Sequence, residues 1–281
     1  MDLTQISLRK DIAQYFEEDD LSRNLFYLEK LPEDKVSCRL HLKSDMVLSG
    51  LPWFLGVFDY LEEKNFAAGS LEKYEGRSFS KGEVLELGEL PFSKALTGER
   101  IALNLLQRAS NISTYTSSYV EKAKKYGIKI LDTRKTTPGL RSLEKYAVRM
   151  GGGFNHRLGQ TDMWMIKDNH KSFFGGVQEA MDFFKSMGTF YTPIELEVHS
   201  LEEFQQAKDL GVRHVMLDNF DPKDIKSAIA QKEGDMTLEV SGGVTLENLE
   251  SYLIEGLDAI SVGSLTYAAP AVDISFKFSR S

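Results

Sequence analysis

The sequence predicts an α/β protein in which an N-terminal α+β module is followed by an incomplete β/α barrel. Of its 281 residues, 42% are hydrophobic, which is enough for a full core and for two domains. From about residue 128 onward, short apolar stretches alternate with helical ones, a pattern typical of a parallel sheet with right-handed crossovers. About six strand candidates occur there, fewer than a closed barrel needs.

The N-terminal module is expected to mix helices with antiparallel strands. Ile6, Ile12 and Phe16 follow an amphipathic spacing, and the alternation over 36–50 is typical of strands. The apolar spacing of LPWFLGVFDYLEE, 51–63, predicts a buried helix. We therefore expect an N-terminal domain over 1–105, with the tail 270–281 packed on it, and a barrel domain over 106–269.

The barrel begins after a long helix that is expected to end near Gly127, where glycine suits a C-cap. The spacing of LEEFQQAKDLG and TLENLESYLIEG predicts helices between the later strands. The predicted strands are IKILDT (128–133), MWMIKD (163–168), IELEV (194–198), HVMLD (214–218), TLEV (237–240) and AISVG (259–263).

Composition excludes several classes of function. The formal net charge of −8 leaves no basic field that could hold a nucleic acid. The single cysteine, Cys38, rules out an intrachain disulfide and a cysteine-rich metal site, which fits a reducing compartment. No run approaches membrane-spanning length, and the N-terminus lacks the apolar core of a signal peptide. We expect a cytoplasmic protein with no membrane or nucleic-acid partner.

Polar and glycine residues follow every predicted strand. Active sites of β/α barrels lie at the carboxyl ends of the strands, so these residues are expected to share one rim. A single charged residue after a strand is usually only a solvated loop, but here each strand contributes. The rim residues are Arg134, Lys135, Lys167, Asp168, Glu197, Asp218, Ser241, Gly242, Gly243, Gly263 and Ser264.

A phosphate site is predicted where EVSGGVTLENLE, 239–250, places two glycines between a strand and a helix. Backbone N–H groups and the helix dipole can converge there on an anion. An ordinary tight turn is the alternative. The loops after the last two barrel strands are the usual phosphate site of such barrels, which favours phosphate.

Five basic side chains, Arg134, Lys135, His156, Arg157 and Lys167, are expected on the same rim. Guanidinium and ammonium groups suit carboxylates or phosphates, although a basic surface loop is the simpler alternative.

Two acidic side chains also end predicted strands. Glu197 shares its strand face with Glu195, and a buried strand glutamate is costly unless a cation, sugar or metal meets it. Glu195 has the alternative of pairing with a lysine of the cluster. The same argument applies to Asp218, for which the alternative is an aspartate that only begins a turn. Carboxylates beside a phosphate site indicate a ribose, a magnesium ion or both.

Six segments together resemble the quinolinate phosphoribosyltransferase family, the nicotinate-nucleotide pyrophosphorylases of NAD synthesis. They occur in family order over about 99–265 and are specific only in combination. The segments are ERIALNLLQRASNIST, ILDTRKTTPGLRSLEKYAVRMGGGFNHRLG, IKDNH, VMLDNF, LEVSGGV and DAISVGSL.

The resemblance implies a fold, a reaction and an assembly. It implies an N-terminal α/β sandwich with an open β/α barrel, working as a homodimer or larger assembly with shared active sites. The implied reaction joins quinolinate and phosphoribosyl pyrophosphate, with Mg²⁺, to give nicotinate mononucleotide, carbon dioxide and pyrophosphate. Arg100 matches an arginine that reaches across to the neighbouring subunit, with a helix-start arginine paired to Glu99 or to solvent as the alternative.

The resemblance also implies roles for individual residues. Lys135, Glu197 and Asp218 match the catalytic set, and Glu197 and Asp218 match the acidic pair near ribose and Mg²⁺, whose contact with the metal can be indirect. The implied substrate-binding residues are Arg100, Thr133, Arg134, Lys135, His156, Arg157, Lys167, Glu197, Asp218, Ser241, Gly242, Gly243, Val262, Gly263 and Ser264.

One segment departs from the family pattern. EDDLSRNLF, 18–26, has Leu21, Arg23 and Asn24 where the family carries glycines and an aspartate. This departure concerns the N-terminal loop and the subunit contact. A related barrel enzyme acting on another base, like the molybdenum-associated homologues of the family, and a catalytically silent binding protein stay open as alternatives.

Overall fold

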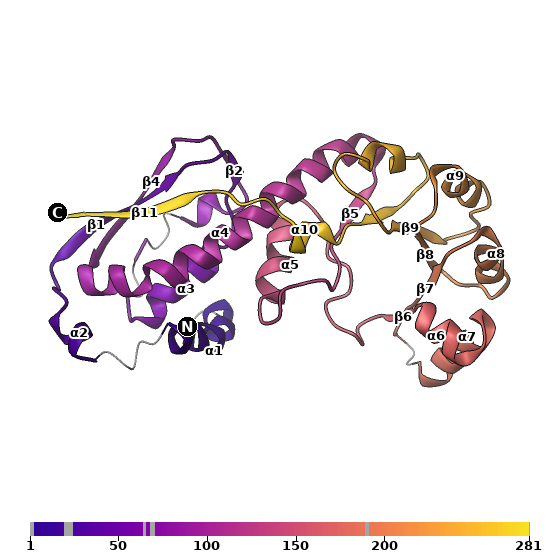
Figure 1. Cartoon of the computed structure of the whole chain (residues 1–281), viewed down its shortest axis with the longest axis horizontal. Helices are drawn as coiled ribbons and strands as arrows, with labels where there is room; N and C mark the ends of the chain where they lie inside the picture. Colours follow the sequence, from indigo (N-terminus) through magenta and orange to yellow (C-terminus); the bar gives the residue numbers. More distant parts are fainter. Residues whose placement is uncertain (1–2, 20–24, 64–65, 68–70, 189–190, 281) are drawn as a thin grey trace. The chain divides into compact units, whose positions relative to one another are not determined.

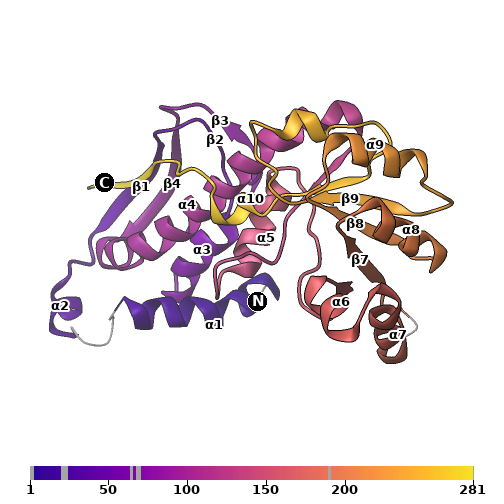
Figure 2. The same ribbon diagram turned by 45° about the vertical axis from the view of Figure 1, so that its right-hand side comes forward.

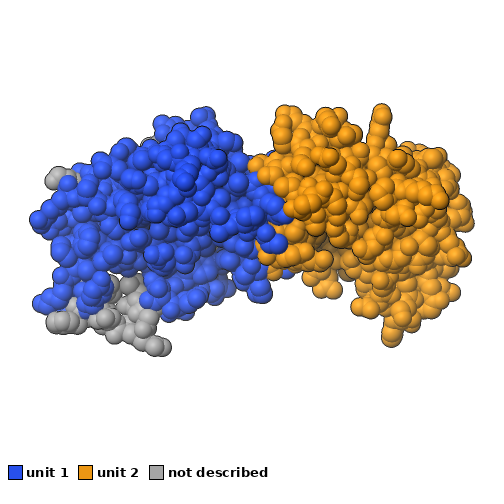
Figure 3. Space-filling model, turned by 45° about the horizontal axis from the view of Figure 1, so that its top comes forward, with its two compact units in different colours: residues 1–115, 137–152, 268–281 blue, residues 116–136, 153–267 orange. Residues whose placement is uncertain are grey.

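The computed structural model describes residues 3–19, 25–63, 66–67, 71–188 and 191–280. The departing positions Leu21, Arg23 and Asn24 lie outside the described residues. The chain forms two compact units that are interleaved in sequence (Figure 3). Unit 1 comprises Met1–Tyr115, Thr137–Gly152 and Ala268–Ser281, and unit 2 comprises Thr116–Thr136 and Gly153–Tyr267. The predicted boundaries at 105 and 269 stay a prediction.

Unit 1 contains a three-stranded antiparallel sheet with the order β11-β1-β4 and a two-stranded ribbon of β2 and β3 (Figure 1). Its strands are β1 (Lys35–Leu42), β2 (Met46–Val47), β3 (Ser78–Phe79), β4 (Val84–Pro91) and β11 (Ile274–Arg280). Its helices are α1 (Leu3–Glu18), α2 (Leu25–Lys30), α3 (Leu51–Tyr60) and α5 (Arg141–Met150), together with the first part of α4 (Phe92–Ala123).

Aromatic packing joins α3 to the C-terminal strand of unit 1. Phe54 and Phe58 of α3 are fully buried and meet Phe276 of β11 edge-on, with ring centroids 5.5 and 5.8 Å apart. The helix lies along one face of the sheet in both ribbon views (Figures 1 and 2). Because β1 pairs with both β4 and β11, the last strand of the chain closes the sheet begun by the first.

A glutamate side chain caps the start of α3. Gly50, with φ 94°, precedes the helix and has no side chain to accept the free N–H groups. Glu75 accepts them instead, from Gly50 at 2.8 Å and from Leu51 at 2.9 Å. Burial raises the pKa of Glu75, against the lowering effect of these N–H groups and of the Tyr146 hydroxyl. A loop residue distant in sequence thus anchors the helix.

Unit 2 is an open parallel sheet with the order β5-β10-β9-β8-β7-β6, which confirms the predicted barrel with an α/β fold. Its strands coincide with the six predicted stretches: β5 (Lys129–Leu131), β6 (Trp164–Ile166), β7 (Ile194–Val198), β8 (His214–Asp218), β9 (Thr237–Ser241) and β10 (Ala259–Ser261). Its helices are α6 (Asp168–Phe174), α7 (Val177–Met187), α8 (Leu201–Asp209), α9 (Pro222–Ala230) and α10 (Ser264–Tyr267).

Two helix predictions need correction. The long helix α4 ends at Ala123 instead of near Gly127, and Gly127 ends the short 3₁₀ extension that follows it, with φ 71°. The stretch 245–256 forms only the 3₁₀ turn Leu249–Tyr252 instead of a helix. Asn248 explains this, because its side-chain amide bonds Gly243 O and Thr245 N, holding the chain in a loop. Within the described ranges, no helix is both long enough and apolar enough to cross a membrane.

Replacing Glu75 by alanine should destabilise unit 1. The substitution leaves the N–H groups of Gly50 and Leu51 without their acceptor, a loss of about 1–3 kcal/mol in the free energy of unfolding. Glu86→Ala is the matched control, because it removes an exposed ion pair with Arg39 that is worth about 1 kcal/mol or less. Chemical unfolding of the wild type and the two variants measures how much free energy of unfolding each variant loses. Equal losses in the two variants would contradict the anchoring role of Glu75.

Candidate functional site

A cavity of about 550 Å³ lies in unit 2 at the carboxyl ends of the strands. Eleven predicted site residues line it: Thr133, Arg134, Lys135, His156, Arg157, Lys167, Glu197, Asp218, Ser241, Gly242 and Gly243. Met165, Met216, Asn219 and Ser261 line it as well, although the sequence did not single them out. Most of the predicted site residues therefore line one cavity.

The other predicted residues lie elsewhere. Val262 is buried, and its N–H donates to Leu131 O at 2.9 Å, so its side chain belongs to the core. Ser264 lies with its hydroxyl 3.4 Å from the Tyr119 hydroxyl. Arg100 is exposed on α4, where it lines a separate cavity of about 310 Å³ within unit 1.

Lys135 is held by the two loops on either side of it. Its N–H donates to Thr133 Oγ1 at 3.0 Å, and its carbonyl accepts from Thr266 Oγ1 at 2.7 Å. A Cβ on Gly263 would lie only 3.0 Å from Lys135 Cδ. The Lys135 side chain thus lies directly against Gly263.

Gly242 is required by close packing against Asn219. It has φ 94°, and a Cβ there would lie 2.2 Å from Asn219 Oδ1, which no rotamer of a larger residue relieves. Asn219 itself has φ 55°, and its N–H donates to Ser241 O at 2.9 Å. The loops after β8 and β9 are thus locked together. The helix dipole expected behind the glycines is missing, because a 3₁₀ turn replaces that helix.

Two lysines that follow β6 neutralise Glu197 of β7 and Glu203 of α8. Lys167 forms an ion pair with Glu197, whose side chain is 7% exposed. Lys171 donates to Glu197 O at 3.1 Å and to Glu203 at 2.7 Å. Glu197 is therefore both buried and paired, as a strand carboxylate at this depth must be.

His199 lies among three carboxylates and was missed by the sequence reasoning. It contacts Asp168, and its ring nitrogens lie 3.7 Å from Glu197 Oε1 and 3.7 Å from Asp218 Oδ2. The ligand atoms of Asp168, Glu197 and His199 lie within 4.8 Å of one another, so this group could hold a cation. Its position directly after β7 was the feature of the sequence that could have identified it as a site residue.

Asp132 positions the segment that carries His156 and Arg157. The aspartate is fully buried at the end of β5 and accepts from Asn155 Nδ2 at 2.6 Å and from His156 N at 2.9 Å. Arg157 in turn donates to Met163 O at 3.1 Å and to Gln160 O at 3.3 Å. A buried charge thus fixes the backbone from which the basic side chains project.

Burial, and after it the crowding of like charges, lowers the pKa values of two basic groups around the cavity. Burial, followed by Arg134, lowers the pKa of Arg157. Burial, followed by Arg157 and Lys167, lowers the pKa of His170. The cations repel one another at this rim, and an anion placed between them would relieve that repulsion.

An aromatic wall adjoins the cations. A second cavity of unit 2, of about 630 Å³, shares Arg134, Arg157, Met165 and Lys167 with the first. Its remaining lining includes Trp164, Phe173, Phe174, Phe183 and Phe184. Cations beside an aromatic wall suit a flat ring that carries acidic groups.

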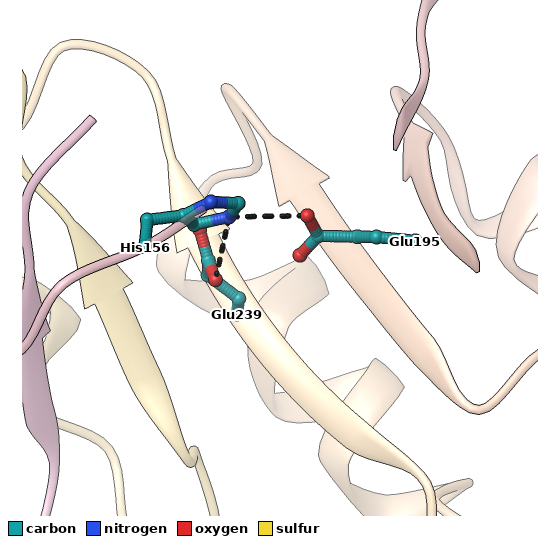
Figure 4. Close-up of side chains that lie close together, drawn as sticks. All are labelled: His156, Glu195 and Glu239. Atoms are coloured by element: carbon teal, nitrogen blue, oxygen red, sulfur yellow. Dashed lines mark ion pairs between the residues drawn. The ribbon is translucent and has the colours of Figure 1, made fainter. Parts of the chain in front are cut away.

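Glu195 pairs with a histidine, whereas the sequence left open a pairing with a lysine. Among the described residues, the ion pair recorded for Glu195 is with His156, at 3.1 Å, instead of with a lysine (Figure 4). Glu239 of β9 lies 3.6 Å from the same ring nitrogen. Sequence reasoning missed Glu239, although its spacing of two from Ser241 places both on one face of β9.

Two family models match the chain: the quinolinate phosphoribosyl transferase N-terminal domain over residues 19–110 and the C-terminal domain over residues 112–277.

Relatives match over most of their length. The chain is 36% identical to a probable nicotinate-nucleotide pyrophosphorylase [carboxylating] of Bacillus subtilis, covering 97% of this chain and 94% of that protein. It is 37% identical to the Homo sapiens nicotinate-nucleotide pyrophosphorylase [carboxylating], covering 85% and 80%. The crystal structure of NadC from Streptococcus pyogenes superposes with a TM-score of 0.91 at 34% identity, covering 99% and 100%. The chain therefore belongs to the quinolinate phosphoribosyl transferase family.

Proposed function

We propose that the cavity of unit 2 is where this chain carries out the reaction of its family, the transfer of phosphoribose from phosphoribosyl pyrophosphate to quinolinate. The transfer is coupled to decarboxylation and yields nicotinate mononucleotide, carbon dioxide and pyrophosphate. One observation carries the proposal: Arg134, Lys135, Arg157 and Lys167 line the same cavity as Glu197 and Asp218. Basic groups that can bind a dicarboxylate thus lie beside acidic groups that can stabilise the positive charge that develops on the ribose.

The basic side chains hold and orient quinolinate. Guanidinium groups of Arg134 and Arg157 match carboxylates in planar geometry, and Lys167 adds a point charge. The aromatic wall beside them supports a flat pyridine ring. The ring nitrogen is itself the nucleophile, so this positioning contributes more to the rate than a protein base would.

The acidic side chains act on the ribose. Loss of pyrophosphate from the anomeric carbon builds oxocarbenium-like positive charge, as in glycoside cleavage. Fixed carboxylates of Glu197 and Asp218 stabilise that charge as it forms. Lys135 adds a further point charge for quinolinate. The loop at Ser241 to Gly243 binds a phosphate group, which its glycines allow to approach the backbone closely. Decarboxylation follows: the bond from the carboxylate to the ring carbon next to the cationic nitrogen breaks, its electron pair stays on that carbon as CO2 leaves, and the carbon then takes a proton from solvent.

Mg²⁺ is part of this proposal. Carboxylate oxygens are ligands that Mg²⁺ prefers, and it is usually bound by one or two carboxylates together with substrate phosphates. Glu197 and Asp218 supply such oxygens on one cavity wall. Lys167 already pairs with Glu197, which favours indirect contact between that glutamate and the metal. When bound, Mg²⁺ would neutralise charge on the pyrophosphate.

A two-fold assembly with shared active sites, in a reducing cytoplasmic location, completes the proposal. Arg100 lies in unit 1 and does not line the unit 2 cavity, which supports its acting on the partner's site. The only cysteine of the sequence, Cys38, is buried, and burial raises its pKa to about 12, so its reactive thiolate form is disfavoured.

An assay for nicotinate mononucleotide tests the proposal directly. Incubation with quinolinate, phosphoribosyl pyrophosphate and Mg²⁺ should give product. Turnover of another base alone would indicate a related barrel enzyme. Absence of any turnover would indicate a silent binding protein.

Lys135→Ala and Arg157→Ala should each weaken quinolinate binding strongly. Truncating one partner of a buried charge pair typically costs roughly 2–5 kcal/mol. Isothermal titration with quinolinate measures the loss, and Lys226→Ala on the exposed face of α9 is the matched control. If both cavity variants titrate like the control, the basic residues do not bind the dicarboxylate.

Glu197→Gln and Asp218→Asn should lower turnover more than they weaken quinolinate binding. Their negative charge matters most when the ribose becomes cationic, so the loss appears mainly in kcat. Steady-state kinetics together with a quinolinate titration separates the two effects. Wild-type turnover in either variant would remove that carboxylate from the mechanism.

Arg100→Ala and Lys135→Ala should complement each other in mixed dimers. Each homodimer should be nearly inactive, whereas a heterodimer regains one unmutated composite site and up to about half the activity per dimer. Differently tagged chains allow heterodimers to be isolated and assayed. Inactive heterodimers of folded chains would show that Arg100 does not act across the interface.

A further inference from the structure

Two lysines at the start of α6 bind opposite ends of the same glutamate. Lys167 pairs with the carboxylate of Glu197, and Lys171 donates from Nζ to the backbone carbonyl of Glu197 at 3.1 Å. Residues four apart lie on the same face of a helix, so this turn of α6 presents both ammonium groups to the end of β7. Glu197 is thus fixed through its main chain as well as through its side chain.

Lys171 is buried, with its side chain 8% exposed. An ammonium group taken out of water is costly unless charged or polar partners replace the lost hydration. Besides the Glu197 carbonyl, those partners are Glu203, at 2.7 Å, and Asp168, at 3.4 Å. Among the described residues, those that line the two cavities of unit 2 do not include Lys171. Its burial therefore serves the backbone that it binds and not a substrate.

Glu203 completes the arrangement from the first turn of α8. Its Oε2 atom accepts from Lys171 and also from the backbone N–H of His199, at 2.8 Å. Ser200, the N-cap of α8, accepts from Glu203 N at 3.2 Å and fixes this turn of the helix. Two consecutive peptide groups directly after Glu197 are therefore held, one by Lys171 and one by Glu203.

The end of β7 needs these anchors because its ladder with β6 has already stopped. The last pair of that ladder joins Ile166 to Leu196, one residue before Glu197. On its other side, Glu197 still pairs with Met216 of β8. Lys171 donates to the Glu197 carbonyl at the point where β6 has given way to α6. A side chain thus replaces the missing strand partner beside a residue that lines the cavity.

We propose that Lys171 and Glu203 are positioning residues for Glu197 in the transfer of phosphoribose, an inference that rests on the proposed function. A carboxylate stabilises a developing positive charge best when it is already in place, since it then need not reorganise during the reaction. The backbone at Glu197 sets where that carboxylate lies. A displacement of about 1 Å can lower a rate on the order of a hundredfold.

Lys171→Met tests the role of the ammonium group. Methionine keeps a long apolar stem in the same space but offers no donor to the Glu197 carbonyl. The value of kcat should fall on the order of tenfold to a hundredfold. Quinolinate should bind with wild-type affinity in an isothermal titration, because the cavity cations are unchanged. The midpoint of chemical unfolding should also fall, because Glu203 loses its cation.

Lys171→Met combined with Glu203→Gln separates positioning from stability. No unpaired charge is left behind, and the net charge of the protein is that of the wild type. The glutamine amide can still accept from His199, so the unfolding midpoint should recover toward the wild-type value. The value of kcat should stay at the level of Lys171→Met, because the Glu197 carbonyl still lacks its donor. Recovery of kcat together with stability would overturn the proposal.

Lys208→Met is the matched control. The Lys208 side chain is 10% exposed and lies 3.5 Å from Glu233, so it resembles Lys171 in burial and in having an acidic partner. It lies in the last turn of α8, whereas Glu203 lies in the first. This variant should lose stability and keep the wild-type kcat. A fall in kcat as large as that of Lys171→Met would show that general destabilisation, and not positioning, lowers turnover.

Hydrogen–deuterium exchange of the backbone over 197–200 gives a readout that does not depend on turnover. Exchange there should be faster in Lys171→Met and in the double variant than in the wild type and in Lys208→Met. If Lys171→Met does not fold, the double variant carries both measurements. Unchanged exchange would overturn the proposal. If the wild type forms no product while exchange behaves as expected, Lys171 does hold the backbone of Glu197, and the proposed function fails instead.

Discussion

Because β5 to β10 run parallel, their carboxyl ends meet at one edge, and every chemical group of the cavity depends on this register. Asp218 pairs with Ser241 across β8 and β9, so an acid and a phosphate-binding loop begin at the same level. Glu197 pairs with Met216 one strand further on, and both line the cavity. An antiparallel sheet would send alternate strand ends to opposite edges and separate these groups.

Charge is distributed unequally between strands and loops. The strands carry the acids, and those acids project from rigid backbone at fixed separations. The loops carry the cations Arg134, Lys135 and Arg157, which therefore need their own anchors. Asp132 fixes the backbone before Arg157, and Thr266 fixes the backbone of Lys135. A scaffold that holds both signs of charge in place can stabilise a transition state without reorganising.

The sequence by itself determined the six strands, the rim residues and the family resemblance, because strand periodicity and the residues that follow each strand are local features. Tertiary structure decided the rest. Residues 137–152 join unit 1 although they lie between strands of unit 2, since Arg108 of α4 bonds the buried Glu144 at 2.6 Å. The turn at 249–252 replaces a helix because Asn248 bonds Gly243. Glu195 meets His156 instead of a lysine because the loop that carries His156 is held by the buried Asp132, and no spacing along the chain encodes that contact.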